Sequence, residues 1–338
     1  MLPQAREAWL RATEVVGNPS SLHASGRAAR RIVEEARESI ADDLGTRPSA
    51  VVFTSGGTEA DNLAVKGLFW ARRQQLATEQ PIIVASSIEH HAVLDPVEWL
   101  VKHEGAEAHW APVDASGCVD ISNITDLLDQ AADRITMVTV MWANNEVGTI
   151  QPVAEIAHVC ATAGVPFHTD TVQALGQVPI DLSTMSSAAV TLSSHKVGGP
   201  VGVGALVVDP HATVEAVAHG GGQERNIRSG TLDAPATSAF AVAVHNAVRD
   251  LDQRVAHLST LQRALINGIH VAVPDAIVNG ASIDDGRRLP GNVHVSIPGA
   301  EGDAVLLLLD AAGVDCSTGS ACTTGIPEPS HVLLAMGS

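Results

Sequence analysis

The sequence predicts an α/β fold in which a mainly parallel sheet is covered by helices and followed by a smaller α+β unit. The first observation is that short apolar runs alternate with helical patterns between residues 50 and 208. Such alternation is typical of a parallel sheet with helices on both faces. The second is that polar clusters follow several of the apolar runs, where the strands would end. The third is a change of pattern after residue 208.

The expected strands of the sheet are short and rich in apolar and β-branched residues. They are residues 50–54, 82–85, 135–141, 165–168, 188–192 and 203–208. Apolar residues at helical spacing fill the gaps between them. The expected helices are one within 1–17, one that ends at Gly45, and those at 92–103, 124–131 and 153–163.

Beyond Val208 a glycine-rich polar loop, residues 219–231, leads into longer helical patterns. The elements expected there are helices at 234–255, 258–270 and 302–312 and strands at 276–278 and 292–297. Together they predict a second, smaller α+β unit. We therefore expect a large domain over 18–238, and a small domain formed by 1–17 together with 239–338.

Composition excludes several classes of function. The 338 residues are 45% hydrophobic and 17% charged, which allows a sizeable core. With 38 acidic and 20 basic residues the net charge is −18, which argues against nucleic acid as a direct ligand. We find neither a secretory signal nor an apolar run of the roughly 20 residues that a membrane span needs. Four cysteines form no disulfide framework in a chain of this length, so a reducing cytoplasm is expected.

Polar clusters follow four of the expected strands. They are Glu89-His90-His91, Asn144-Asn145-Glu146, Thr169-Asp170 with Gln173, and His195-Lys196. In an open parallel sheet, ligands bind at the carboxyl ends of the strands. A single polar residue there is explained by a helix cap, but four clusters at equivalent places indicate a binding site.

Lys196 lies at a turn between two expected buried strands, where we expect the amine to be desolvated. Desolvation lowers the pKa of a lysine and enables it to form a Schiff base. Ser193 and His195 can hold an anion such as a phosphate, and so can the glycine-rich turn 55–59 before a helix. A lysine, a phosphate cradle and an acidic partner indicate pyridoxal 5′-phosphate (PLP). The alternatives are a solvated surface lysine and a plain connecting turn.

A second candidate functional segment lies near the end of the chain. Residues 316–325 are small, hydroxylated and rich in glycine, which predicts an exposed, mobile loop at the mouth of the Lys196 pocket. Cys322 in this loop has no apolar neighbours of the kind that surround a core cysteine. We interpret it as a nucleophilic thiol. The alternative is an incidental loop cysteine.

The motifs together resemble those of one known family, and they occur in its order over nearly the whole chain. The matching stretches are 18–23, 53–59, 89–93, 144–148, 168–173, 194–196, 228–231 and 319–322. The sequence is similar to the NifS/IscS-type cysteine desulfurases, which are PLP enzymes of the class V aminotransferase family with fold type I. The length of the cysteine loop resembles the branch in which that loop is extended.

The resemblance implies a role for each residue of the cofactor site. Lys196 is expected to hold PLP as a Schiff base and to move the Cα proton of L-cysteine, while Asp170 pairs with the ring nitrogen. His90 is expected to stack on the ring and to handle protons near the substrate thiol. Further contacts are implied at the phenolic oxygen for Asn145 and Gln173, and at the phosphate for Gly57, Thr58, Ser193 and His195.

The resemblance also implies a sulfur acceptor and a partner subunit. The thiolate of Cys322 would attack the substrate sulfur, which leaves a persulfide on Cys322 and alanine as the product. Thr231 would reach the phosphate bound by the neighbouring subunit, so a homodimer is expected. The persulfide would then pass to an iron–sulfur scaffold protein, to a carrier for tRNA thiolation, or to both.

The family pattern extends beyond both ends of this sequence, so we expect a truncated form. The arginine that grips the substrate carboxylate in the family lies in the part beyond the carboxyl end, and no other arginine is assigned to that role. Two alternatives therefore stand beside the desulfurase. One is another class V lyase, similar to selenocysteine lyase or kynureninase, and the other is an inactive PLP-binding or scaffold protein.

Overall fold

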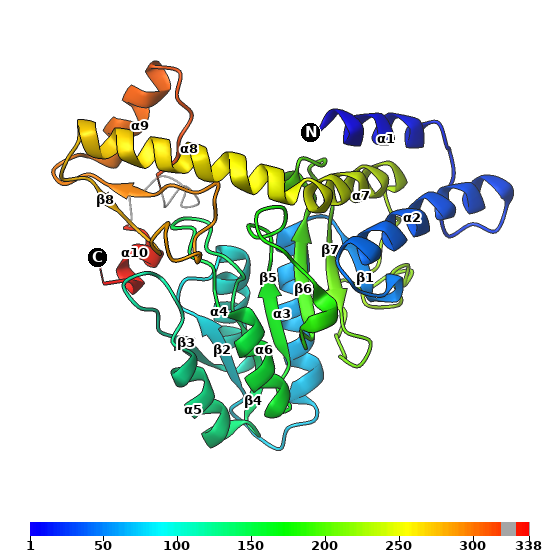
Figure 1. Ribbon diagram of the computed structural model, residues 1–338. Helices are drawn as coiled ribbons and strands as arrows, with labels where there is room; N and C mark the ends of the chain where they lie inside the picture. Colours follow the sequence, from blue (N-terminus) through cyan, green and yellow to red (C-terminus); the bar gives the residue numbers. More distant parts are fainter. Residues whose placement is uncertain (319–328, 338) are drawn as a thin grey trace.

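The computed structural model describes residues 1–318 and 329–337. Its centre is a seven-stranded sheet in the order β1-β7-β6-β5-β4-β2-β3 (Figure 1). The strands are β1 (Val51–Thr54), β2 (Ile82–Ser86), β3 (Glu107–Ala111), β4 (Ile135–Thr139), β5 (Phe167–Asp170), β6 (Ala189–Ser193) and β7 (Gly204–Val208). β2 is parallel to β3 and β4, β4 to β5, and β5 to β6, whereas β7 is antiparallel to β6 and β1. The predicted mainly parallel sheet is confirmed.

Helices cover both faces of the sheet because successive strand residues point to opposite sides. Ile83 of β2 packs in one apolar cluster with α3 (Gly57–Arg73) and α4 (His91–Glu104). Its neighbour Ile82 packs in another cluster with α5 (Ile121–Ala131) and α6 (Val153–Thr162). The resulting α/β/α layers leave the carboxyl ends of all the strands except the antiparallel β7 at one edge.

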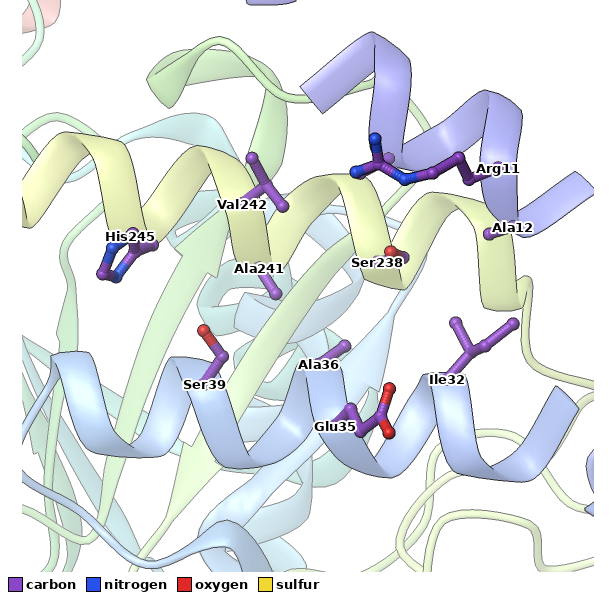
Figure 2. Close-up of a pocket in the computed structure, with 11 residues that line it drawn as sticks. Arg11, Ala12, Ile32, Glu35, Ala36, Ser39, Ser238, Ala241, Val242 and His245 are labelled. Atoms are coloured by element: carbon purple, nitrogen blue, oxygen red, sulfur yellow. The ribbon is translucent and has the colours of Figure 1, made fainter. Parts of the chain in front are cut away.

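A third group of helices covers the end of the sheet formed by β1, β7 and β6. It consists of α1 (Pro3–Thr13), α2 (Ala24–Asp43) and α7 (Ala234–Arg249). Ala5 of α1 lies in the same apolar cluster as Val51 and Leu192 of the sheet and Phe240 of α7. These contacts place α1 on α7 at this end of the large sheet, while the division into domains 18–238 and 1–17 with 239–338 stays a prediction. A groove of about 460 Å³ lies between these helices. Figure 2 shows side chains that line it, and none of the predicted site residues is among the lining residues.

The remaining elements extend away from α1 (Figure 1). They are α8 (Leu251–Ala272), the antiparallel pair β8 (Ile277–Val278) and β9 (Val295–Ser296), α9 (Gly302–Ala311) and α10 (His331–Ala335). Short 3-10 turns are η1 (Pro48–Ala50), η2 (Leu182–Thr184) and η3 (Ser194–Val197). None of the helices in the described ranges has both the length and the apolarity required to cross a membrane.

Two details differ from the sequence-based expectation. β3 was not predicted, because this edge strand pairs with β2 alone and leaves Glu107 and Trp110 exposed, so it lacks a continuous apolar run. The helix expected over 234–255 is interrupted at Asp250, whose backbone has non-helical torsion angles of φ −98° and ψ 15°. Arg249 pairs with the carboxylate of Asp250 at 2.8 Å at this break.

A buried ion pair anchors the loop 219–231 to the sheet. The guanidinium of Arg37 on α2 donates two hydrogen bonds of 2.8 Å to the carboxylate of Glu224. The same carboxylate accepts the backbone N–H of Phe53 at 2.8 Å, and Arg37 also donates to the carbonyl of Val51. Glu224 is thereby fixed between α2 and β1, and it holds the loop that ends in Thr231.

We predict that Glu224→Gln destabilises the fold by about 3–5 kcal/mol, because it leaves the Arg37 charge buried without its partner. Urea unfolding followed by circular dichroism measures this difference. The matched control is Glu34→Gln, which removes the second and half-exposed carboxylate beside Arg37 and should cost about 1 kcal/mol or less. Equal losses in the two variants would contradict the anchoring role of Glu224.

Candidate active site

Four neighbouring strands deliver the polar clusters to one edge of the sheet. β2, β4, β5 and β6 are adjacent and parallel, so their carboxyl ends align. His90 follows β2 as the residue that caps α4, and Asn145 follows β4. Asp170 is the last residue of β5, and Lys196 lies in η3 directly after β6. The structure therefore brings together residues that are up to 106 positions apart in sequence (196 − 90).

Lys196 is exposed in the single chain. The expectation of a desolvated lysine is therefore wrong for this structure, because η3 carries the side chain past the ends of the buried strands. Its positive charge nevertheless lowers the pKa of two of its neighbours, His90 and Asp170. Lys196 thus lies near both the imidazole and the carboxylate that the sequence predicts around the cofactor.

The acidic groups below this edge differ in their affinity for protons. Burial raises the pKa of Asp170 to about 6, while the N–H of Val172 and the charge of Lys196 act to lower it. Burial raises the pKa of Glu89 to about 8, because the N–H of Met141 offsets only part of the effect of burial and the charge of Asp170 raises the pKa further. At neutral pH Asp170 is therefore ionised and Glu89 keeps its proton.

His90 is held in one tautomer by its own helix. Its Nδ1 accepts a hydrogen bond of 3.0 Å from the backbone N–H of Ala92. Burial lowers the pKa of His90, and the charges of His91 and Lys196 lower it further. The neutral ring therefore carries its proton on Nε2, and it can donate that proton in a hydrogen bond.

An anion cradle lies where the start of α3 meets the end of β6. A Cβ atom on Gly57 would lie 3.1 Å from Val172 Cγ2 and 3.4 Å from Ser193 Cβ, so any larger residue would press on these two side chains. The hydroxyl of Ser193 lies 2.9 Å from Nδ1 of His195. Thr58 follows Gly57 in the first turn of α3, where backbone N–H groups are free for an anion.

The remaining predicted residues occupy different surroundings. Gln173 is half-buried three residues after Asp170, and Asn145 is half-buried with its carbonyl 3.5 Å from Nδ2 of Asn292. Thr231 is exposed, two residues before Asp233 at the start of α7. Cys322 and its loop lie outside the described residues, so their mobility and position stay predictions.

The sequence-based reasoning missed a polar layer under the site. Thr139, His168 and Thr191 lie side by side on β4, β5 and β6, and the ring nitrogens of His168 lie 2.8 and 3.0 Å from the two threonine hydroxyls. Asp61 of α3 approaches Nε2 of His168 to 3.6 Å. Burial lowers the pKa of His168 to about 3 and raises that of Asp61 far above its usual value. The stretch 168–173 was singled out, but its His168 was not.

A second missed contact ties Thr231's loop to the anion cradle. Nε of Arg228 donates to Glu59 at 2.7 Å, and Glu59 also accepts the N–H of Ser55 at 2.6 Å. A glutamate in the first turn of a helix is a known capping signal, so Glu59 was identifiable from sequence. Its distant partner Arg228 was not.

These residues fit pyridoxal 5′-phosphate. The cradle formed by Gly57, Thr58, Ser193 and His195 supplies N–H, hydroxyl and imidazole groups that suit a phosphate. Asp170 supplies a buried carboxylate for a protonated ring nitrogen. Lys196 supplies an amine that interacts electrostatically with the same carboxylate. The donor set therefore matches the chemistry of the cofactor at both of its ends.

We predict that Glu89→Gln makes the fold less sensitive to pH. Unfolding lowers the pKa of Glu89 from about 8 to its usual 4.5, so within this window the native state holds a proton that the unfolded chain has lost. The wild type therefore loses stability as the pH rises, by at most about 1.4 kcal/mol per pH unit from this group. In urea unfolding at about pH 5 and pH 8, the free energy of unfolding of Glu89→Gln relative to that of the wild type should be higher at pH 8 than at pH 5. The surface variant Glu98→Gln should follow the wild type at both values, and parallel curves for all three proteins would contradict the buried proton.

The chain is similar to known proteins in both sequence and fold. The chain is 52% identical over 337 residues to an IscS-like cysteine desulfurase of Mycobacterium tuberculosis, over 100% of this chain and 85% of that protein. It is 40% identical over 325 residues to the cysteine desulfurase IscS of Clostridium botulinum, over 96% and 80% of the two chains. A solved NifS-like protein superposes with a TM-score of 0.89 at 32% identity, over 100% and 87% of the two chains. The class-V aminotransferase family matches residues 7–338, and this chain belongs to that family.

Proposed function

We propose that this protein is a PLP-dependent cysteine desulfurase that converts L-cysteine to L-alanine and retains the sulfur on Cys322. The main observation in favour of this function is that Lys196 lies near Asp170 and His90, beside the anion cradle at Gly57. The desulfurase relatives support the same reaction. They do not favour the alternatives of a selenocysteine lyase-like enzyme or an inactive scaffold.

The chain's own residues divide the binding of the cofactor among them. PLP, when bound, supplies an electron sink for the charge that remains after a proton leaves Cα of the substrate. Gly57, Thr58, Ser193 and His195 hold its phosphate, and Asn145 and Gln173 its phenolic oxygen. Asp170 keeps the ring nitrogen protonated, because an ionised carboxylate beside that nitrogen raises its pKa.

Lys196 and His90 handle protons in this proposal. Lys196 would hold the cofactor through its amine, and the free amine would take the proton from Cα of the substrate. Neutral His90 presents Nε2–H to the ring and the substrate thiol, since its Nδ1 is engaged by Ala92. It therefore orients the sulfur by donating a hydrogen bond.

Cys322 completes the reaction as the sulfur acceptor. Its thiolate attacks the substrate sulfur, the Cβ–S bond breaks, and the sulfur remains on the protein as a persulfide. This persulfide then passes to an outside acceptor, which we propose to be an iron–sulfur scaffold protein or a carrier for tRNA thiolation. The described cysteines Cys118, Cys160 and Cys316 are free thiols, which supports a reducing cytoplasm as the compartment.

We predict that PLP-loaded protein given L-cysteine and a reductant releases sulfide and alanine in equal amounts. Cys322→Ser should lower the rate of sulfide release by at least about 100-fold, because the nucleophile is lost. The absorbance of the bound cofactor should be unchanged in this variant. The measurement is sulfide by colorimetry and alanine by chromatography on the same samples.

Two controls define the assignment. Cys316→Ser, which changes the exposed cysteine closest in sequence, should leave the rate at that of the wild type. Lys196→Ala should abolish turnover together with the visible absorbance of the lysine-bound cofactor. Sulfide release at the full rate from Cys322→Ser would refute Cys322 as the acceptor.

We also predict a homodimer in which Thr231 contacts the phosphate held by the partner subunit. Light scattering should give twice the 35.0 kDa of the single chain. Thr231→Ala should weaken PLP binding by about tenfold, as expected when one hydrogen bond to a charged group is lost. A monomeric protein that retains PLP, or a dimer in which Thr231→Ala binds PLP like the wild type, would contradict this arrangement.

A further inference from the structure

The residues that follow segment 319–328 are bonded to the immediate neighbours of two proposed cofactor contacts. The hydroxyl of Ser330 donates to Oε2 of Glu146 at 2.5 Å, and Glu146 directly follows Asn145. Nε2 of His331 lies 3.0 Å from the carbonyl oxygen of Glu89, which directly precedes His90. Because a carbonyl only accepts, Nε2 of His331 carries the proton.

Glu146 is a rigid acceptor because its backbone is fixed on both sides. Its N–H donates to Oδ1 of Asn144 at 2.9 Å, and its carbonyl accepts from Nδ2 of Asn292 at 2.7 Å. Asn144 is itself fully buried and donates to the carbonyl of Ile88 at 3.0 Å. Ser330 is thus attached to the frame of the site and not to a mobile surface group.

An apolar contact adds a second attachment one turn further on. Val332 and Met336 of α10 pack in one buried cluster with Ile88, Met141 and Val147, which flank the ends of β2 and β4. The hydroxyl of Ser330 also accepts the N–H of Leu333 at 3.3 Å, so it caps the short helix. The apolar contact holds the body of α10, whereas the polar contacts hold its first residues.

These contacts lie close to Cys322 in the sequence. Ser330 comes eight residues after Cys322, and eight residues span at most about 26–29 Å when fully extended. A fixed Ser330 therefore bounds the distance between the sulfur and the edge of the site. Without the polar contacts the tether would lengthen toward Val332, and the orientation of its starting point would be lost.

We propose that Ser330 and His331 are positioning residues for sulfur transfer, which fix the origin of the Cys322 tether to the residues beside Asn145 and His90. The inference rests on the proposed function, since it assumes that Cys322 receives the sulfur. It adds residues that are bonded to the neighbours of Asn145 and His90 and that act through the length and direction of the tether. Restricting a reacting group in this way raises its effective concentration at the target.

The experiment is a single turnover of PLP-loaded protein with L-cysteine, in which the persulfide on Cys322 is trapped by alkylation and counted by mass spectrometry. Ser330→Ala should slow persulfide formation by about tenfold while cofactor content and its absorbance stay at wild-type values. Ser330→Thr, which keeps the hydroxyl, should restore most of the rate. In cofactor-free Ser330→Ala the amide of Leu333 should exchange its hydrogen faster than in wild type.

The matched control is Ser122→Ala, which removes a serine–carboxylate hydrogen bond of 2.6 Å to Asp120 at the start of α5. It should leave persulfide formation unchanged. If Ser330→Ala does not fold, His331→Leu and His331→Gln make the same comparison, because glutamine keeps an N–H donor for the Glu89 carbonyl. Wild-type transfer rates in Ser330→Ala or His331→Leu, or a loss of rate that parallels loss of cofactor, would overturn the inference. Absence of any persulfide in the wild type would instead refute the proposed function.

Discussion

The parallel pairing of β2, β4, β5 and β6 is the constraint on which the rest of the structure depends. Parallel strands end at the same edge, so each strand delivers the residues that follow it to one place. The register sets Thr139 opposite His168 and Asp170 opposite Thr191, which puts their side chains on the α3 side of the sheet. An antiparallel partner at any of these positions would send one of the polar clusters to the far edge.

Burial then separates acids that are chemically alike. Asp170 and Glu89 are both buried, but only Asp170 has the charge of Lys196 to counteract desolvation. Of these two acids, the ionised one therefore lies where a protonated ring nitrogen needs it. Asp61 and His168 add a second polar layer, in which burial favours the neutral form of each group. Because both groups are neutral, this layer does not compete with Asp170 for the positive charge of Lys196.

Long-range polar contacts hold the loops that complete the site. The pair Arg37–Glu224 fixes the loop 219–231 to β1, and Arg228–Glu59 ties the same loop to the start of α3. On the other side, Asn292 and Ser330 both bind Glu146 beside Asn145. The site is thus framed by contacts from segments that lie after the sheet in sequence, and the sheet supplies their fixed partners.

Local sequence determined every strand of the central sheet except β3, the glycine-rich start of α3, and the clusters around His90, Asn145, Asp170 and Lys196. Hydrophobic periodicity and turn residues carry this information because they act over a few positions. Tertiary structure decided the rest. The partners Arg37 and Glu224 are 187 positions apart, and strand β3 forms only because β2 offers it an edge. The exposure of Lys196, the retained proton of Glu89 and the break at Asp250 depend on which groups surround each residue after folding. Burial and long-range pairing belong to the folded chain as a whole, and a linear pattern does not contain them.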